Sequence, residues 1–483
     1  MSTQTSGVAP TEGSNRRTFL RRGATAAGGG LFAVAAMEGM TIRAASAEEG
    51  HKDKVAENNG GYGELRKLTR TDPESGFEQS LWLPEEFDFR VFSTAGSLMP
   101  DGNTVPLGHD AMACFATDDP NVWRIVRNHE ERSDAGEAAP SGRKDNRYDP
   151  LGGGGTTTMW IRWEQDAPVF EKAWQSLSGT IVNCAGGPTP WRTWLSCEET
   201  TAGTGAGWDA EHGYVFEVSA DAPQEVAPVP LKAMGRFVHE AVAVDPGTGI
   251  VYETEDQGTA GFYRFLPNTP GELADGGQLQ MLKVKDEWNY DTRTGQRAKR
   301  SIPVEWVDID DPDPADAEEV PLAVFNQGWA RGAAVFGRLE GCWWGNGAVY
   351  IASTSGGDEG EGQIWEYIPH GRSGGHLRLV FESPDAELLS YPDNITVSPS
   401  GNLVLCEDTS RDLPAVRGLT RDGEIFPFVY HEGSREWCGA TFSPDGKVLF
   451  VNIQGATNGD PTDPSLEPGR TIAIWGPWDK GVL

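Results

Sequence analysis

The sequence contains few basic residues for its length. Among 483 residues, 40 are Lys or Arg and 72 are Asp or Glu, so the formal net charge is −32. A surface with this excess of negative charge repels phosphate backbones, which argues against nucleic-acid binding. The excess favours metal cations as partners, although a plain solvated acidic surface would have the same composition.

Long apolar runs are absent as well. No stretch of 18 apolar residues occurs, so we expect no transmembrane helix and no stable membrane insertion. The Walker loop, the H-E-x-x-H zinc motif and the EF-hand loop are also missing, which removes the most easily recognised phosphate and metal sites. The cysteines are too widely spaced for a compact disulfide scaffold, but their even number permits disulfides in an oxidising compartment. They are Cys114, Cys184, Cys197, Cys342, Cys406 and Cys438.

The N-terminus carries an export signal. Arg16 and Arg17 are followed by Thr-Phe-Leu and a weakly apolar segment rich in Gly and Ala, and Ala-Ser-Ala at 45–47 matches a small-x-small cleavage site. The paired arginines indicate the twin-arginine export machinery as a partner. We therefore predict a signal peptide at residues 1–47 and an extracytoplasmic location in the periplasm, at the cell surface or in the medium.

Glycine and proline are abundant. The 61 Gly and 32 Pro favour many turns and short strands over long helices, and the 17 Trp help to fill a large core. Residues 48–86 are polar and Gly-rich, and we predict a mobile entry segment there. From residue 87 to residue 483, short apolar runs alternate with turns, which indicates one domain.

One phrase recurs along this domain. VAVDPGTGIVYETED (242–256), ITVSPSGNLVLCED (395–408) and ATFSPDGKVLFVNIQ (440–454) each combine a short strand, a Pro/Gly turn and an apolar strand. CWWGNGAVYIASTSG (342–356) is a looser version. The pattern is typical of β-hairpins that repeat at about the length of one propeller blade. The predicted fold class is all-β, a six-bladed β-propeller with long inter-strand insertions.

Pairs of acidic residues end several of these segments. They are Glu198-Glu199, Glu255-Asp256 and Glu407-Asp408. Because strand ends in a propeller face the central channel, these carboxylates would repel one another unless cations lie between them. Oxygen ligands suit Ca²⁺, and iron accepts oxygen and thiolate ligands together. The pattern therefore predicts a metal site on the propeller axis.

Further candidates lie in three other segments. Glu240, close to Val238 and Ala241, would fit poorly in a plain apolar core. Arg338 and Glu340 share one face of a strand, so they either line one site or form a surface ion pair. Arg411 follows Glu407 by four residues, where a guanidinium could bind a phosphate oxygen.

The stretch CAGGPTPWRTWLSCEET (184–200) concentrates unusual chemistry. It holds two cysteines, two adjacent glycines, two tryptophans and two adjacent glutamates. Cys184 is either a metal ligand or one half of a disulfide with Cys197. Strand alternation places Cys197 and Glu199 on one face, so the sequence leaves both interpretations open.

Together these segments resemble the PhoX family of twin-arginine-exported alkaline phosphatases. The resemblance covers most of the chain after the leader, through GHDAMACF, RIVRNHE, YDPLGGGGTTTMW, GRFVHEAVAVDP, GFYRFLP, GRLEGCWW and SPDGKVLFVNIQ. The stretch from Cys184 onward is its most specific part.

Membership would imply a six-bladed propeller with an axial cluster of iron and calcium (Fe³⁺ and Ca²⁺), and hydrolysis of small phosphorylated substrates. By motif, Cys184 resembles the iron ligand, and Arg338 and Arg411 resemble phosphate-binding arginines. The ending CEDTS departs from the shorter Thr-Asp-Gly ending of the phosphatases, which bears on activity more than on fold. The implied metal carboxylates are Glu198 or Glu199, Glu240, Glu340, and Glu407 or Asp408.

Two other functions stay open from the sequence. A non-catalytic calcium-binding propeller would bind calcium without stoichiometric iron. A propeller lactonase with a single calcium would not need Cys184. We expect a monomer in each case.

Overall fold

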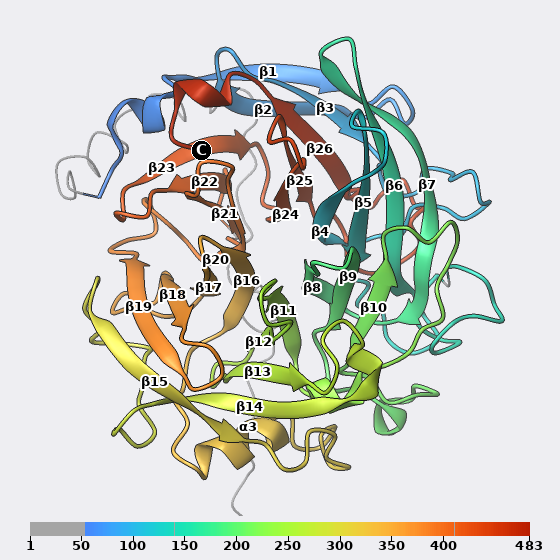
Figure 1. Ribbon diagram of the computed structural model, residues 1–483. Coiled ribbons are helices and arrows are strands. Elements are labelled where there is room, and N and C mark those ends of the chain that lie inside the picture. Colours follow the sequence, from blue (N-terminus) through green and yellow to red (C-terminus); the bar gives the residue numbers. More distant parts are fainter. Residues whose placement is uncertain (1–53, 140, 410) are drawn as a thin grey trace, which may run out of the picture. The chain divides into compact units, whose positions relative to one another are not determined.

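Strands surround a central axis in the computed structural model shown in Figure 1. The structure describes residues 54–139, 141–409 and 411–483. The predicted leader at 1–47 and its cleavage site lie outside the described residues. No helix within the described ranges is long and apolar enough to cross a membrane.

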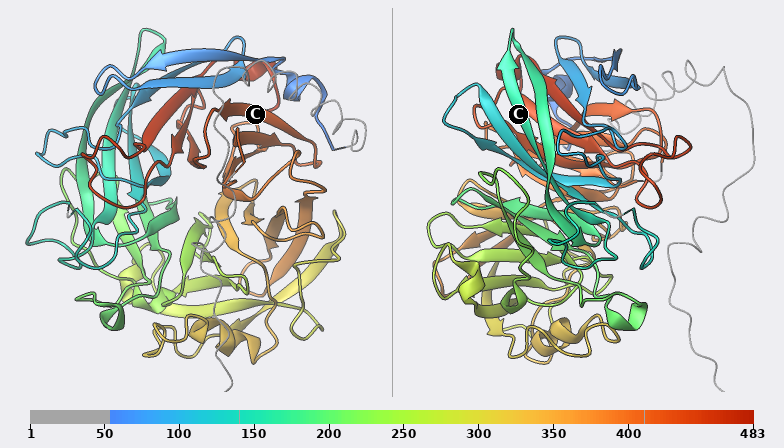
Figure 2. Two further views of the ribbon diagram at one scale, coloured as in Figure 1. Left: turned by 180° about the vertical axis from the view of Figure 1, so that it is seen from behind. Right: turned by 90° about the vertical axis from the view of Figure 1, so that its right-hand side faces the viewer.

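Six blades of antiparallel strands make up the fold, and Figure 2 shows the same ring of blades from behind. Blade 1 comprises β4 (His109–Ala116), β5 (Val122–His129), β6 (Gly154–Glu164) and β7 (Ala167–Thr180). Blade 2 comprises β8 (Asn183–Pro188), β9 (Thr193–Glu198) and β10 (Val215–Ser219). Blade 3 comprises β11 (His239–Val244), β12 (Val251–Glu255), β13 (Phe262–Pro267), β14 (Gly277–Val284) and β15 (Ser301–Asp308).

The second half of the ring is built in the same way. Blade 4 comprises β16 (Leu339–Gly345), β17 (Ala348–Ser353), β18 (Gln363–Pro369) and β19 (Gly375–Glu382). Blade 5 comprises β20 (Pro392–Val397), β21 (Leu403–Glu407), β22 (Ala415–Leu419) and β23 (Ile425–His431). Blade 6 comprises β24 (Trp437–Phe442), β25 (Val448–Ile453) and β26 (Arg470–Trp475), and β3 (Asp88–Phe92) completes it. Pairing of β15 with β19 joins blades 3 and 4 in one sheet.

Helices occur as short pieces in the connections. Among the described residues, the α-helix is α3 (Ala323–Trp329). The 3₁₀ helices are η2 (Glu57–Gly61), η3 (Thr204–Ala206), η4 (Lys232–Met234), η5 (Leu273–Asp275) and η6 (Trp478–Lys480). The prediction of an all-β propeller is therefore confirmed.

The recurring phrases of the sequence are the innermost hairpins of blades 3 to 6. They fold as β11–β12, β16–β17, β20–β21 and β24–β25, as predicted. Every residue of β11 and β25 is buried. Because both faces of an inner strand pack against neighbouring blades, these strands are apolar runs and do not alternate with polar residues.

The N-terminal part of the domain closes the ring, which corrects one prediction. We expected residues 48–86 to be a mobile entry segment, but β1 (Leu65–Thr71) and β2 (Glu78–Pro84) lie inside it. β2 pairs with β23 at the outer edge of blade 5, and β1 pairs with β2. Leu81 and Leu83 of β2 are fully buried, so burial of alternate residues on one face orders this strand, which begins with three polar residues.

Closure of the ring joins segments from the two ends of this domain. β3 pairs with β26 over Phe92↔Thr471 to Asp88↔Trp475. An N-terminal strand thus supplies the outermost position of a blade built from C-terminal strands. This arrangement removes the open edge that β26 would otherwise expose.

Candidate metal centre on the propeller axis

The six innermost strands begin in the same way. In five of these strands, a register shift against the hairpin partner lies between the first and the fourth residue, and in β24 it lies between the second and the fifth residue. A β-bulge of this kind re-aims the side chains next to it. We call the second residues of these strands the first ring. It consists of Asp110, Cys184, Glu240, Glu340, Asp393 and Cys438.

Two more rings follow from the same hairpins. In each inner hairpin, the residue that directly follows the second strand donates its backbone N–H to a carbonyl near the start of the first strand. The acceptor is the residue two positions before the first-ring residue, and the N···O distances are 2.6–3.3 Å. The donors form the second ring, which is Glu130, Glu199, Asp256, Thr354, Asp408 and Gln454. The acceptors form the third ring, which is Gly108, Val182, Val238, Arg338, Tyr391 and Glu436. These bonds fix the second and third rings at one end of the axis.

Several third-ring residues have left-handed backbone. The φ angles are +49° at Val182, +45° at Arg338 and +52° at Tyr391, and Gly108 has +57°. This conformation is strained for residues with a side chain, above all for β-branched Val182. The same left-handed conformation occurs in blades 1, 2, 4 and 5, so the turn of the chain into the innermost strand imposes it.

Acidic side chains from the rings form a continuous cluster. Four sets of three groups each have ligand atoms within 4.8 Å of one another. The sets are Asp110–Glu130–Cys184, Cys184–Glu199–Glu240, Glu240–Glu340–Asp393 and Asp393–Asp408–Glu436. Shared members link each set to the next, so the cluster runs around the axis from blade 1 to blade 6.

Cys184 is the soft ligand in this cluster. Its Sγ lies 3.0 Å from Glu240 Oε1 and 3.7 Å from Asp110 Oδ2. Burial and these neighbouring carboxylates raise the pKa of the Cys184 thiol well above its ordinary value. A thiol in such surroundings becomes a thiolate only if a cation binds it.

The carboxylates of the cluster are buried without enough opposite charge. Burial and mutual repulsion raise the pKa of Asp110 and Glu240 well above the ordinary range. Burial and Asp408 raise the pKa of Asp393 to about 7. Such shifts express the free energy of confining like charges away from water. Metal ions would remove that repulsion, and a set of carboxylates with one thiol fits both hard and borderline cations.

Two guanidinium groups pair with part of this charge. Arg338 Nε lies 3.0 Å from Asp256 Oδ1, and its Nη2 contacts Glu340 and lies 4.0 Å from Asp408 Oδ2. Arg132 Nη2 contacts both Glu130 and Glu199. Arg338 therefore belongs to the site, and the alternative of a plain surface pair with Glu340 is wrong.

Six of the predicted site residues meet at the axis. The structure brings together Cys184, Glu199, Glu240, Glu340, Asp408 and Arg338.

Glu198 and Glu407 do not join them. Their carboxylates accept backbone N–H groups from the loops beyond their own strands, for example Gly213 N on Glu198 at 2.9 Å and Ala415 N on Glu407 at 2.9 Å. Adjacent residues in a strand face opposite sides, so only the second member of each acidic pair reaches the cluster.

Arg411 lies elsewhere. It is exposed on the loop between β21 and β22. Within the described residues, its recorded hydrogen bond joins its backbone N–H to Thr409 Oγ1 at 3.3 Å, and its guanidinium has no described contact with the cluster.

Five members of the site were not predicted from the sequence. They are Asp110, Glu130, Asp393, Glu436 and Arg132. Each acid stands beside the start or the end of an inner hairpin, in GHDAM, RNHE, YPDN and REWC. An alignment of the six hairpins on one another would have found them, because each acid occupies a ring position.

The proposed disulfide does not form. All six cysteines are free. Cys197 lies fully buried in an apolar cluster with Leu195 and Val215 of blade 2, while Cys184 faces the axis. Cys438, the sixth member of the first ring, donates its S–H to His109 O at 3.0 Å and belongs to none of the four ligand sets.

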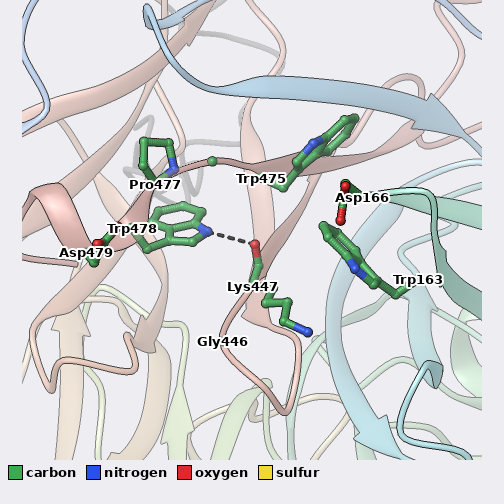
Figure 3. Close-up of a pocket in the computed structure, with 9 residues that line it drawn as sticks. Trp163, Asp166, Gly446, Lys447, Trp475, Pro477, Trp478 and Asp479 are labelled. Carbon is green, nitrogen blue, oxygen red and sulfur yellow. Dashed lines mark hydrogen bonds between the residues drawn. The ribbon is translucent and has the colours of Figure 1, made fainter.

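A separate cavity of about 510 Å³ lies outside the axial cluster. Trp163, Trp475 and Trp478 surround it, and Trp478 Nε1 donates to Lys447 O at 2.8 Å (Figure 3). No residue of the three rings lines this cavity. The acidic axis is therefore the candidate site.

Comparisons with known proteins identify the family and agree with this fold. The family model described as alkaline phosphatase PhoX matches residues 66–457. Among solved structures, PhoX of Pseudomonas fluorescens in complex with vanadate, a transition state analogue, has a TM-score of 0.64 at 18% identity, over 87% of this chain and 99% of that chain. A gluconolactonase of Xanthomonas campestris has a TM-score of 0.33 at 13% identity, over 77% of this chain and 97% of that chain. Curated protein sequences gave no significant match.

Proposed function

The chain belongs to the PhoX alkaline phosphatase family, and on that premise we propose that it hydrolyses phosphate monoesters at metal ions held on the propeller axis. The observation that carries the proposal is the cluster itself, in which the Cys184 thiol and buried or half-buried carboxylates from six blades lie beside a paired arginine. A propeller that binds no metal does not need so much buried like charge.

Iron and calcium are the metals that we propose. Cys184 would hold iron together with Asp110, Glu130, Glu199 or Glu240, which share its two sets. Calcium, which prefers oxygen ligands, would lie among the carboxylates contributed by blades 3 to 6. When bound, these ions would supply Lewis-acid stabilisation of the phosphoryl oxygens.

The chain's own residues would bind and orient the substrate. Arg338 is held by Asp256 and Glu340, so its planar fork has a fixed direction before a ligand arrives. A guanidinium in that position matches the geometry of phosphoryl oxygens and neutralises charge as it develops on them.

Hydrolysis of p-nitrophenyl phosphate by the protein, purified with its metals, tests the proposal. We expect turnover at neutral to alkaline pH that a chelator abolishes and that iron with calcium restores. Absence of metal-dependent turnover would refute it. A lactonase would keep its activity after Cys184→Ala, whereas the proposed phosphatase would lose it.

We also propose export by the twin-arginine route, on the evidence of the leader sequence around Arg16 and Arg17. Cell fractionation of a variant with both residues changed to Lys should find the protein retained in the cytoplasm. Normal export of that variant would contradict the route.

A further inference from the structure

Arg132 lies at the same end of the axis as Arg338. Arg132 follows second-ring Glu130 by two residues, and Arg338 is a member of the third ring. Because second-ring amides bond to third-ring carbonyls, both arginines stand at this one end. The Arg132 backbone is fixed there by a 2.6 Å bond from its N–H to Thr457 O.

Both guanidinium groups are partly exposed to solvent, as is the Asp408 carboxylate, whose side chain is 22% exposed. The side chains of Arg132 and Arg338 are 31% and 24% exposed. The carboxylates that they contact are less exposed, at 4% for Glu130, 10% for Glu199 and 3% for Glu340. A ligand that approaches this part of the cluster from solvent therefore meets the arginines before it meets these carboxylates.

Both guanidinium groups keep donors for such a ligand. Arg132 uses Nη2 for Glu130 and Glu199, and no described residue accepts from its Nε or Nη1. Arg338 uses Nε and Nη2, and no partner within the described residues is recorded for its Nη1. Ion pairs on one side of a guanidinium fix the direction of the planar group. The N–H donors on its other side are then already oriented to bind a second anion.

We propose that Arg132 is a second phosphate-contacting residue, which binds the phosphoryl group together with Arg338. This inference rests on the proposed phosphatase function and extends it to the substrate contacts. Arg132 comes from the edge of blades 1 and 2, and Arg338 reaches carboxylates of blades 3, 4 and 5. Between them lie Cys184 and Glu240, so a phosphoryl group held by both arginines would rest over the thiol-containing part of the cluster.

Equilibrium binding separates this role from a purely structural one. We would titrate inorganic phosphate and orthovanadate into the metal-loaded protein by calorimetry, and measure metal content on the same samples. The variants are Arg132→Ala, Arg132→Lys and, as control, Arg143→Ala. Arg143 lies on the same insertion and pairs with exposed Asp145 at 3.5 Å.

Loss of charge-assisted hydrogen bonds predicts weaker binding of both anions by Arg132→Ala, by roughly 10- to 100-fold. Arg132→Lys should lie between this variant and the wild type, because Lys keeps the charge and loses the fork. Arg143→Ala should bind like the wild type, and all variants should keep their metal.

Three results would overturn the inference. Unchanged anion affinity in Arg132→Ala would overturn the inference about Arg132 but leave the proposed phosphatase function standing. Loss of metal from both Arg132 variants would assign Arg132 to the metal scaffold. Failure of the metal-loaded wild type to bind either anion would overturn the proposed function as well.

Discussion

A buried histidine neutralises one of the acidic residues that stands next to the site. His212 Nδ1 lies 2.6 Å from Glu198 Oε1, and its Nε2 lies 3.4 Å from Asp149 Oδ2. All three side chains are fully buried. Burial by itself would lower the pKa of His212, but Glu198 and Asp149 outweigh it and raise the value to about 9. His212 therefore carries a proton at neutral pH and holds Glu198 in place directly before Glu199.

This arrangement predicts a pH-dependent stability. A folded-state pKa of about 9, above the ordinary value of 6.5, stabilises the fold fully below pH 6.5. That contribution, on the order of 3 kcal/mol, is lost as the pH rises through 9. We expect His212→Gln to lower the free energy of unfolding strongly at pH 6 and by a smaller amount at pH 10.

Urea unfolding of the wild type and His212→Gln at both pH values measures the effect. The exposed His370 offers a matched control, since His370→Gln should change stability little at either pH. An equal loss in His212→Gln at pH 6 and pH 10 would mean that His212 is neutral in the folded protein.

At the scale of the element, β8 owes its position to two glycines. A Cβ on Gly186 would lie 1.9 Å from Leu195 O of β9, and a Cβ on Gly187 would lie 1.9 Å from Val242 O of β11. Backbone atoms cannot yield to such contacts as a flexible side chain does. The glycines therefore let β8 approach both neighbours, and Cys184 reaches Glu240 from the start of the same strand.

Gly187→Ala should separate β8 from β11. Overpacking of a buried site destabilises proteins by roughly 1–3 kcal/mol, and more where backbone atoms clash. We expect a lower unfolding midpoint in urea and less bound metal, because Cys184 and Glu240 would move apart. Gly258→Ala is the matched control, since a Cβ there meets no atom within 4 Å. Normal metal content in Gly187→Ala would show that the approach of β8 does not shape the site.

Local pattern predicted the hairpins well and the site in part. The Pro/Gly turns and apolar strands of three phrases located β11–β12, β20–β21 and β24–β25, because hairpin formation is a local property. The acidic pairs were recognised, but Glu199 and Asp408 were not distinguished from Glu198 and Glu407. Which member faces the axis depends on register and on the β-bulge, and both are set by pairing between strands.

For the whole molecule, the site is a consequence of closing the ring. Blades 1 to 6 each place a first-ring residue at the axis, and Glu436 of blade 6 reaches Asp393 of blade 5. Gln454 Nε2 joins blade 6 to blade 1 through Asp110 Oδ2 at 3.2 Å. Residues from Asp110 to Gln454 therefore meet only after the last blade has formed.

This dependence explains what the sequence could not predict. Asp110 and Asp393 carry no local sign of metal binding, because each needs a ligand from another blade, Cys184 for Asp110 and Glu436 for Asp393, to complete its set. Strand β1 looks polar in the sequence, and its order comes from pairing with β2, which in turn pairs with β23 far along the chain. The stretch from Cys184 onward could be recognised from the sequence because its distinctive residues are close together in the chain.

Elemental analysis of the purified, exported protein and its Cys184→Ala variant tests the central claim most directly. Cys114→Ala, at a half-buried position in blade 1, is the control. We predict whole-number iron and calcium in the wild type and in the control, and loss of iron from Cys184→Ala. A wild type without bound metal, or a Cys184→Ala variant that keeps the wild-type iron content, would contradict a thiolate-anchored metal centre on the axis.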